Sequence, residues 1–143
     1  MKKSVWMSLT ILILAIGAFA TSQAKPSMTI SMSGVAEAPG PGDPDGSGMA
    51  VLTLDMGKNQ ICYQLTVSNI ETATAAHIHR GEVGFPGPVV VSLTPPSSGS
   101  SQDCVSVDKD LLREIHKNPT AFYLNVHNAA FPDGAIRGQL VRH

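Results

Sequence analysis

The sequence predicts an all-β fold, an antiparallel β-sandwich or β-barrel with one short helix. Apolar and polar residues alternate along most of the chain, which is the pattern of strands with one buried face. Gly, Pro, Asn and Asp separate these segments and are the residue types of turns. The chain has 143 residues and a formal net charge of -1, and this length is enough for one domain and hardly for two.

Six or seven strands are expected in chain order. Six alternating segments are residues 28–33, 50–56, 61–67, 89–93, 122–126 and 136–140. The turn Gly57-Lys58-Asn59 joins the second segment to the third. The turn Pro132-Asp133-Gly134 makes the last two strands a hairpin, in which Gly134 supplies a positive φ.

One helix is expected between Asp108 and Asn118. Asp108 is a typical N-cap residue, and the Asn118-Pro119 pair ends the helix. The apolar stripe of this helix consists of Leu111, Leu112 and Ile115.

Two segments are expected to be loops, residues 39–48 and the Ser-rich residues 95–102. The first contains Asp43 and Asp45 in a short sequence that is faintly similar to a calcium loop. The later Glu that would complete such a site is missing at the required spacing, so a simple turn is favoured.

The N-terminus is expected to be a cleaved signal peptide, residues 1–24. Lys2 and Lys3 precede an apolar run over residues 5–20, and small residues Ser22 and Ala24 precede a cut before Lys25. The alternative is a transmembrane anchor, but the run is short for a span of about 30 Å. Cleavage would leave a single domain, residues 25–143, secreted or periplasmic and no longer held at a membrane.

Export favours a disulfide between Cys62 and Cys104, because exported proteins fold in an oxidising compartment. Two free thiols are the alternative. By alternation Cys62 points outward, so the bridge is expected to tie a surface loop onto the wall of the barrel. Such a bridge would stabilise the fold by roughly 4 kcal/mol in the chain-entropy model.

Charge and motifs exclude several classes of function. A net charge of -1 indicates no nucleic-acid partner. The sequence has no G-x-S-x-G, no H-E-x-x-H, no phosphate-binding loop and no paired C-x-x-C. We therefore expect no enzymatic activity of a common type. The partner would be an extracytoplasmic protein or glycan, which the sequence does not identify.

Three expected strands carry polar residues on the face opposite the core. They are His77 and His79, then Asn125 and His127, then Arg137 and Gln139. Two His residues at i and i+2, with a third on a neighbouring strand, can supply three imidazoles to one metal ion. The alternative is a solvated or loop-covered face on which the same groups bond backbone carbonyls and each other.

If a metal binds, copper is expected, held by His77, His79 and His127, because imidazole ligands suit copper and copper heads the divalent affinity order. Zinc with three His and a water is the other candidate. Asn125 and Gln139 would then orient the imidazoles. Arg137 would have to turn away or pair with Glu82 or a bound anion. We expect no enzymatic activity, and the alternative is redox chemistry at such a copper site.

Four stretches resemble the CHRD domain, named after chordin, and the resemblance extends over essentially the whole mature chain, residues 27–141. The strongest likeness lies in AAHIHRGEVGFPGPVVVSL (residues 75–93) and YLNVHNAAFPDGAIRGQL (residues 123–140). The opening strands of the family are similar to MTISMSGVAEAP (residues 28–39) and ICYQLTV (residues 61–67). The blocks occur in the family's order and spacing.

The resemblance implies an immunoglobulin-like sandwich, similar in shape to copper-zinc superoxide dismutase. His77-Ile78-His79 is similar to the H-V-H of that enzyme's copper strand, but this chain lacks a bridging His and a zinc loop. In chordin the domain is part of an extracellular antagonist of growth factors. The Cys-rich modules that bind the growth factor there are missing here. We therefore expect a non-catalytic binding or structural module, with copper binding for storage, delivery or weak redox protection as the alternative.

Overall fold

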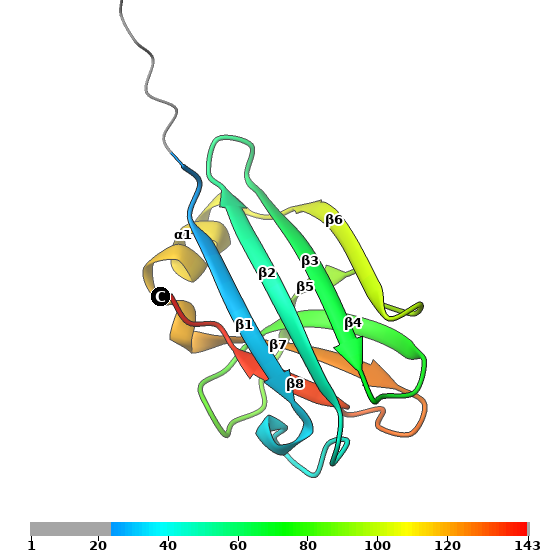
Figure 1. Ribbon diagram of the computed structural model, residues 1–143. Helices are drawn as coiled ribbons and strands as arrows, with labels where there is room; N and C mark the ends of the chain where they lie inside the picture. Colours follow the sequence, from blue (N-terminus) through cyan, green and yellow to red (C-terminus); the bar gives the residue numbers. More distant parts are fainter. Residues whose placement is uncertain (1–23, 143) are drawn as a thin grey trace, which may run out of the picture.

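Eight strands and one α-helix form the described part of the chain, residues 24–142, in the computed structural model (Figure 1). The strands are β1 (Ser27–Ser33), β2 (Ser47–Asp55), β3 (Gln60–Ser68), β4 (Ala73–Arg80), β5 (Val89–Leu93), β6 (Ser100–Ser106), β7 (Phe122–Asn128) and β8 (Ile136–Gln139). The predicted signal peptide lies outside the described residues, apart from Ala24.

All strand pairs are antiparallel, in the order β5-β4-β7-β8-β1-β2-β3-β6. The sheet folds over between β8 and β1, where the register holds the pair Ser33–Arg137, so its two halves lie face to face (Figure 1). The two edges approach each other beyond β5: the hydroxyl of Ser101 donates to the Thr94 carbonyl at 2.8 Å, and the Thr94 amide donates to the Tyr63 hydroxyl at 2.7 Å. The predicted all-β sandwich, here a nearly closed barrel, is confirmed.

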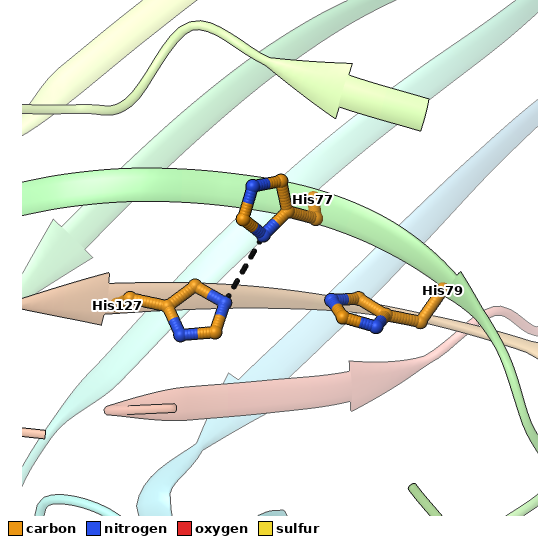
Figure 2. A group of neighbouring side chains, drawn as sticks. All are labelled: His77, His79 and His127. Atoms are coloured by element: carbon orange, nitrogen blue, oxygen red, sulfur yellow. Dashed lines mark hydrogen bonds between the residues drawn. The ribbon is translucent and has the colours of Figure 1, made fainter. Parts of the chain in front are cut away.

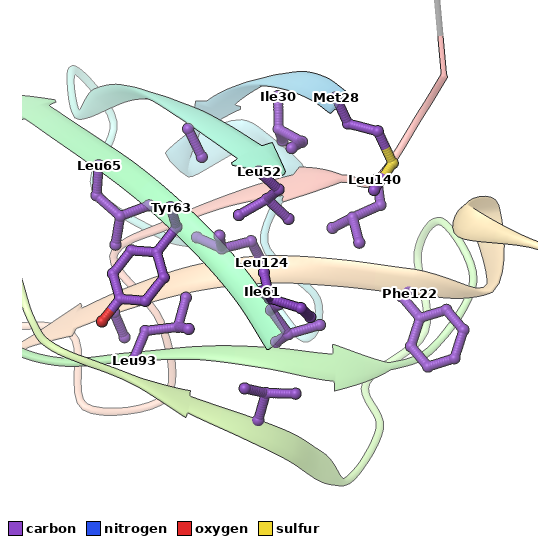
Figure 3. Close-up of a cluster of buried hydrophobic side chains, with 14 of the residues drawn as sticks. Met28, Ile30, Leu52, Ile61, Tyr63, Leu65, Leu93, Phe122, Leu124 and Leu140 are labelled. Carbon is purple, nitrogen blue, oxygen red and sulfur yellow. The ribbon is translucent and has the colours of Figure 1, made fainter. Parts of the chain in front are cut away.

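The core lies between the two halves of the sheet (Figure 3). Alternation places every second side chain of a strand in it, as in β1, where Met28, Ile30 and Met32 are buried and their neighbours are not. The same rule buries the inward set of the other strands, including Leu52, Leu54, Ile61, Leu65, Ile78, Phe122, Leu124 and Ile136.

Helix α1 (Lys109–Lys117) begins and ends where the sequence predicts. Oδ1 of Asp108 accepts hydrogen bonds from the amides of Asp110, at 2.8 Å, and Leu111, at 3.2 Å. Leu112 and Ile115 are fully buried in the core, so the apolar stripe packs against the sandwich.

The prediction of a loop over residues 95–102 is wrong at its end, because β6 begins at Ser100. Most side chains of β6 are exposed and polar, so the apolar alternation that marks the other strands is missing here. The strand is held instead by its backbone pairing with β3. The predicted loop over residues 39–48 likewise ends early, at the start of β2. The described residues thus contain eight strands, not six or seven.

The predicted disulfide is confirmed, with Cys62 and Cys104 joined at an S–S distance of 2.03 Å. Its expected role is corrected. Cys104 lies on β6 directly opposite Cys62 on β3, so the bridge links two paired strands and not a surface loop to the wall. The covalent link therefore secures the edge strand whose side chains contribute little to the core.

The predicted turns are also found. Gly134 has a φ of 147° in the β7–β8 connection, and its amide donates to the Phe131 carbonyl. Asp55 caps the β2–β3 turn by accepting from the Gly57 and Lys58 amides. The Gly46 amide donates to the Asp43 carbonyl, as the turn interpretation of that segment requires.

Candidate metal centre

The polar face predicted on three strands lies on the outer surface of β4, β7 and β8. The antiparallel register sets its residues in rows across the strands. His79, Tyr123 and Gln139 form one row, and His77, Asn125 and Arg137 form the next. His127 follows on β7, diagonally beside His77.

The structure brings His77, His79 and His127 together (Figure 2). Nδ1 of His77 lies 3.1 Å from Nε2 of His127, and one nitrogen of each ring lies within 4.8 Å of the other two. The three side chains come from two neighbouring strands, which fix them without a long loop. Among residues 24–142 this is the group of His, Cys, Asp and Glu side chains with the spacing of a metal site.

Backbone carbonyls set the protonation of two rings. Nδ1 of His79 lies 2.8 Å from the Gly87 carbonyl oxygen, and Nδ1 of His127 lies 2.9 Å from that of Pro132. A carbonyl only accepts, so each Nδ1 carries the proton. The neutral form of His79 then keeps a lone pair on Nε2, whereas Nε2 of His127 faces Nδ1 of His77 and Oδ1 of Asn125. The Nε2 of His79 is buried, and no hydrogen-bond partner for it exists among the described residues.

Burial favours the neutral form of His77 and His127. It is the largest cause that lowers the pKa of His77, followed by the charges that His127 and His79 would carry. Burial also lowers the pKa of His127, against an opposing contribution from the hydrogen bond to Pro132. At neutral pH these imidazoles are therefore in the state that binds a metal ion.

The loop of residues 81–88 covers this face. Arg137 donates to the backbone carbonyls of Phe85, at 3.1 Å, and Glu82, at 2.8 Å. Gln139 donates to the Gly81 carbonyl at 2.7 Å. The loop-covered alternative therefore accounts for Arg137 and Gln139. The expected pairing of Arg137 with the Glu82 side chain is replaced by a bond to the Glu82 backbone.

The two residues expected to orient imidazoles differ in position. Oδ1 of Asn125 lies 3.1 Å from Nε2 of His127, beside the cluster. Gln139 contacts no imidazole, because its amide donates to the carbonyls of Gly81, Thr120 and Phe122. Asn125 is thus placed to act on the site, and Gln139 is placed to hold the loop.

Sequence reasoning missed Tyr123. Its ring stacks on His79, with centroids 4.8 Å apart and an interplanar angle of 10°, and the Arg137 guanidinium carbon lies 3.5 Å from the Tyr123 centroid. Its hydroxyl accepts from the Gly87 amide at 3.2 Å. The signal was available, because Tyr123 shares the alternation of Asn125 and His127 and so points outward.

Glu37 was missed as well. Burial raises the pKa of this carboxyl to about 7, against the opposing charge of Arg137. Its Oε1 is buried without a hydrogen-bond partner in the described part of the chain. No motif surrounds Glu37 in the sequence, since its environment is assembled by the β7–β8 connection far along the chain.

The family model of the CHRD domain matches residues 28–140, nearly all of the described chain. The protein belongs to the CHRD family. Curated proteins and solved structures yield no match to it. Two blocks of this CHRD domain that resemble the family, residues 75–93 and 123–140, contain most of β4 and β7 and all three clustered His residues. No helix among residues 24–142 has the length and apolarity to cross a membrane.

Proposed function

We propose that this CHRD protein acts outside the cytoplasm as a non-catalytic binding module and that its ligand is copper, held by His77, His79 and His127. Export is supported by the sequence of residues 1–24 and agrees with the Cys62–Cys104 disulfide. The absence of a nucleophile–base motif from the sequence supports binding over catalysis.

The observation that carries the proposal is the Nε2 atom of His79. It is a buried lone pair without a donor, on a ring whose other nitrogen is held by Gly87 and whose face is stacked on Tyr123. A purely structural His has no need for such a nitrogen, because a buried polar atom without a partner costs about 1–3 kcal/mol. A metal ion bound there would remove that cost.

Copper fits the donor set better than the other common metals. Imidazole nitrogens bind copper and zinc, whereas magnesium and calcium require oxygen ligands. Copper binds nitrogen sites more tightly than zinc does. Metal-bound His residues also commonly donate their other ring N–H to a carbonyl, as His79 and His127 do here.

The test uses the protein expressed with its own N-terminus and purified after export. Titration with Cu(II), followed by electron paramagnetic resonance, should show one bound copper with nitrogen hyperfine structure. That signal should be lost in the triple variant His77→Ala, His79→Ala, His127→Ala and kept in His116→Ala, which changes a His on α1. Equal copper in wild type and triple variant would contradict the proposal.

A partner protein is a second candidate ligand. Val83, Phe85 and Val89 are exposed on the covering loop and the adjacent start of β5, and they are apolar. A glycan would favour polar contacts, which these three side chains do not offer, so the surface fits a protein better. The change Phe85→Ser should weaken capture of such a partner from the extracytoplasmic fraction and leave copper binding unchanged.

A further inference from the structure

We propose that the His77–His79–His127 site selects monovalent copper, Cu(I), over the divalent ions Cu(II) and Zn(II). This inference rests on the proposed function, because it assumes that the three imidazoles hold copper. It adds the oxidation state of the ion. Three observations support the inference. They are the charge of the three ligands, the number of ligands, and the buried Arg137 guanidinium on the same face.

All three donors are neutral. In the described part of the chain, no carboxylate or thiolate shares the cluster with the three imidazoles. A dication bound by neutral ligands keeps its full charge of +2 beneath the covering loop, where desolvation is costly. A monovalent ion in the same place keeps only +1.

A fixed positive charge lies on the same face. Arg137 is 1% exposed, its guanidinium lies over Tyr123, and the ring of Tyr123 stacks on His79. One aromatic ring therefore separates the guanidinium from a ligand imidazole. At a separation of about 10 Å and an effective dielectric constant of about 20, each unit of ion charge weakens binding roughly tenfold.

Two carboxylates could offset the positive charge of Arg137. Glu37 follows β1 and is near enough to Arg137 for that positive charge to lower its pKa, but burial raises the pKa of Glu37 overall and so favours the neutral acid. Asp133 is fully on the surface beside His127, where solvent screens its charge. The buried Arg137 is thus the dominant fixed charge near the imidazoles.

The number of donors points the same way. Cu(II) favours tetragonal sites with four or more donors, and zinc takes four. Cu(I), a d¹⁰ ion, forms stable three-coordinate complexes with nitrogen ligands. The Nε2 of His79 is closed off from solvent, which limits water as an added ligand. The remaining neighbour is the Asn125 amide oxygen, a neutral donor.

The experiment compares affinities on the exported, disulfide-bonded protein. Cu(I) is supplied anaerobically as its acetonitrile salt, without added reductant, and competed against a chromophoric Cu(I) chelator. Cu(II) and Zn(II) are competed against chelators of their own. The expected preference for Cu(I) over Cu(II) is at least about 100-fold relative to the aqueous ions, which raises the potential of the bound couple by about 120 mV.

Asn125→Asp is the matched variant, because it places a negative charge beside Nε2 of His127 with almost no change in shape. It should lower the preference for Cu(I) at least about tenfold by strengthening the binding of dications. His116→Ala should leave the preference unchanged. Circular dichroism of each variant checks that it is folded, and the wild-type ratio decides the question even if Asn125→Asp does not fold.

The outcomes separate the two proposals. Tighter binding of Cu(II) or Zn(II) at the same three His residues overturns the Cu(I) inference and leaves the proposed function in place. An unchanged preference in folded Asn125→Asp overturns the charge argument. If the triple His variant still binds all of these ions as tightly as the wild type does, both proposals are overturned.

Discussion

Neighbouring polar residues on one face of the sheet have unlike roles, which their hydrogen bonds distinguish. Arg137 and Gln139 donate to the loop carbonyls of Glu82 and Gly81, whereas His79 and His127 each direct Nδ1 at a backbone carbonyl. Among the described residues Nε2 of His79 has no hydrogen-bond partner, and Nε2 of His127 faces Nδ1 of His77. Alternation in the sequence assigns all four to the same face. Only the hydrogen-bond partners distinguish the residues that hold the loop from the candidate metal ligands.

Gly134 is predicted to be required for stability. Its φ of 147° is strained for other residues, and a Cβ there would lie 2.5 Å from the carboxylate of Glu37. Gly134→Val should lower the free energy of unfolding by about 2 kcal/mol or more, measured by urea denaturation. Gly84→Val is the control, because Gly84 also has a positive φ but has open space around it. This substitution should lower the free energy of unfolding by less than Gly134→Val does. Equal stability of Gly134→Val and wild type would contradict the assignment.

Glu37 is predicted to make stability fall as pH rises. Its pKa is raised from 4.5 to about 7 in the fold, so the folded state holds a proton that the unfolded state releases. The stabilisation is complete below pH 4.5 and is lost as pH rises through about 7. After allowance for partial exposure, the change is on the order of 1–2 kcal/mol.

Glu37→Gln should remove this dependence, because the amide does not titrate. Urea denaturation of both proteins between pH 4 and pH 8 checks it. Parallel stability profiles for wild type and Glu37→Gln would show that Glu37 titrates normally.

At the scale of elements, apolar alternation predicts the strands that line the core and does not predict the other elements. The segments around Ile30, Leu52 and Leu124 were predictable, because burying one face of a strand leaves a period of two in the sequence. The strand β6 was not, because its side chains are largely exposed and its place depends on backbone pairing. The hydrogen bonds to the covering loop could not be predicted either, because their acceptors are backbone carbonyls, which every residue carries.

The disulfide is predicted to secure β6. The double variant Cys62→Ser, Cys104→Ser should lose about 2–5 kcal/mol of stability and keep its fold. Hydrogen exchange should show the loss of protection concentrated in the amides of β6 and its partner β3. Thiol titration of denatured, unreduced wild type should find no free SH. Uniform loss of protection over all strands would contradict this local role.

Gln139 is predicted to hold the loop without affecting copper. Gln139→Ala removes the side-chain donor to the carbonyls of Gly81 and Thr120, while the Phe122 carbonyl keeps its bond from the Leu140 amide, and the loss should cost about 1–3 kcal/mol of stability. Copper affinity should change less than about threefold, because Gln139 contacts no imidazole. A large loss of affinity with normal stability would mean that Gln139 acts on the metal site.

At the scale of the whole molecule, the core and the candidate site lie on opposite faces of the same strands. Ile78, Leu124 and Val126 point into the sandwich, while His77, His79 and His127 point outward from the same β4 and β7. The core therefore fixes the spacing of the imidazoles without sharing side chains with them. We therefore expect the domain to stay folded when no metal ion is bound at the candidate site.

The most direct test of the central claim, that copper binds these three imidazoles, is nitrogen-15 NMR of the His side chains during titration with Cu(I). Before copper is added, His79 and His127 should each carry a proton on Nδ1, which faces a backbone carbonyl. One equivalent should shift Nε2 of both rings and Nδ1 of His77, and leave His116 unchanged. Copper binding without a shift of Nε2 of His79, or shifts confined to His116, would contradict the account.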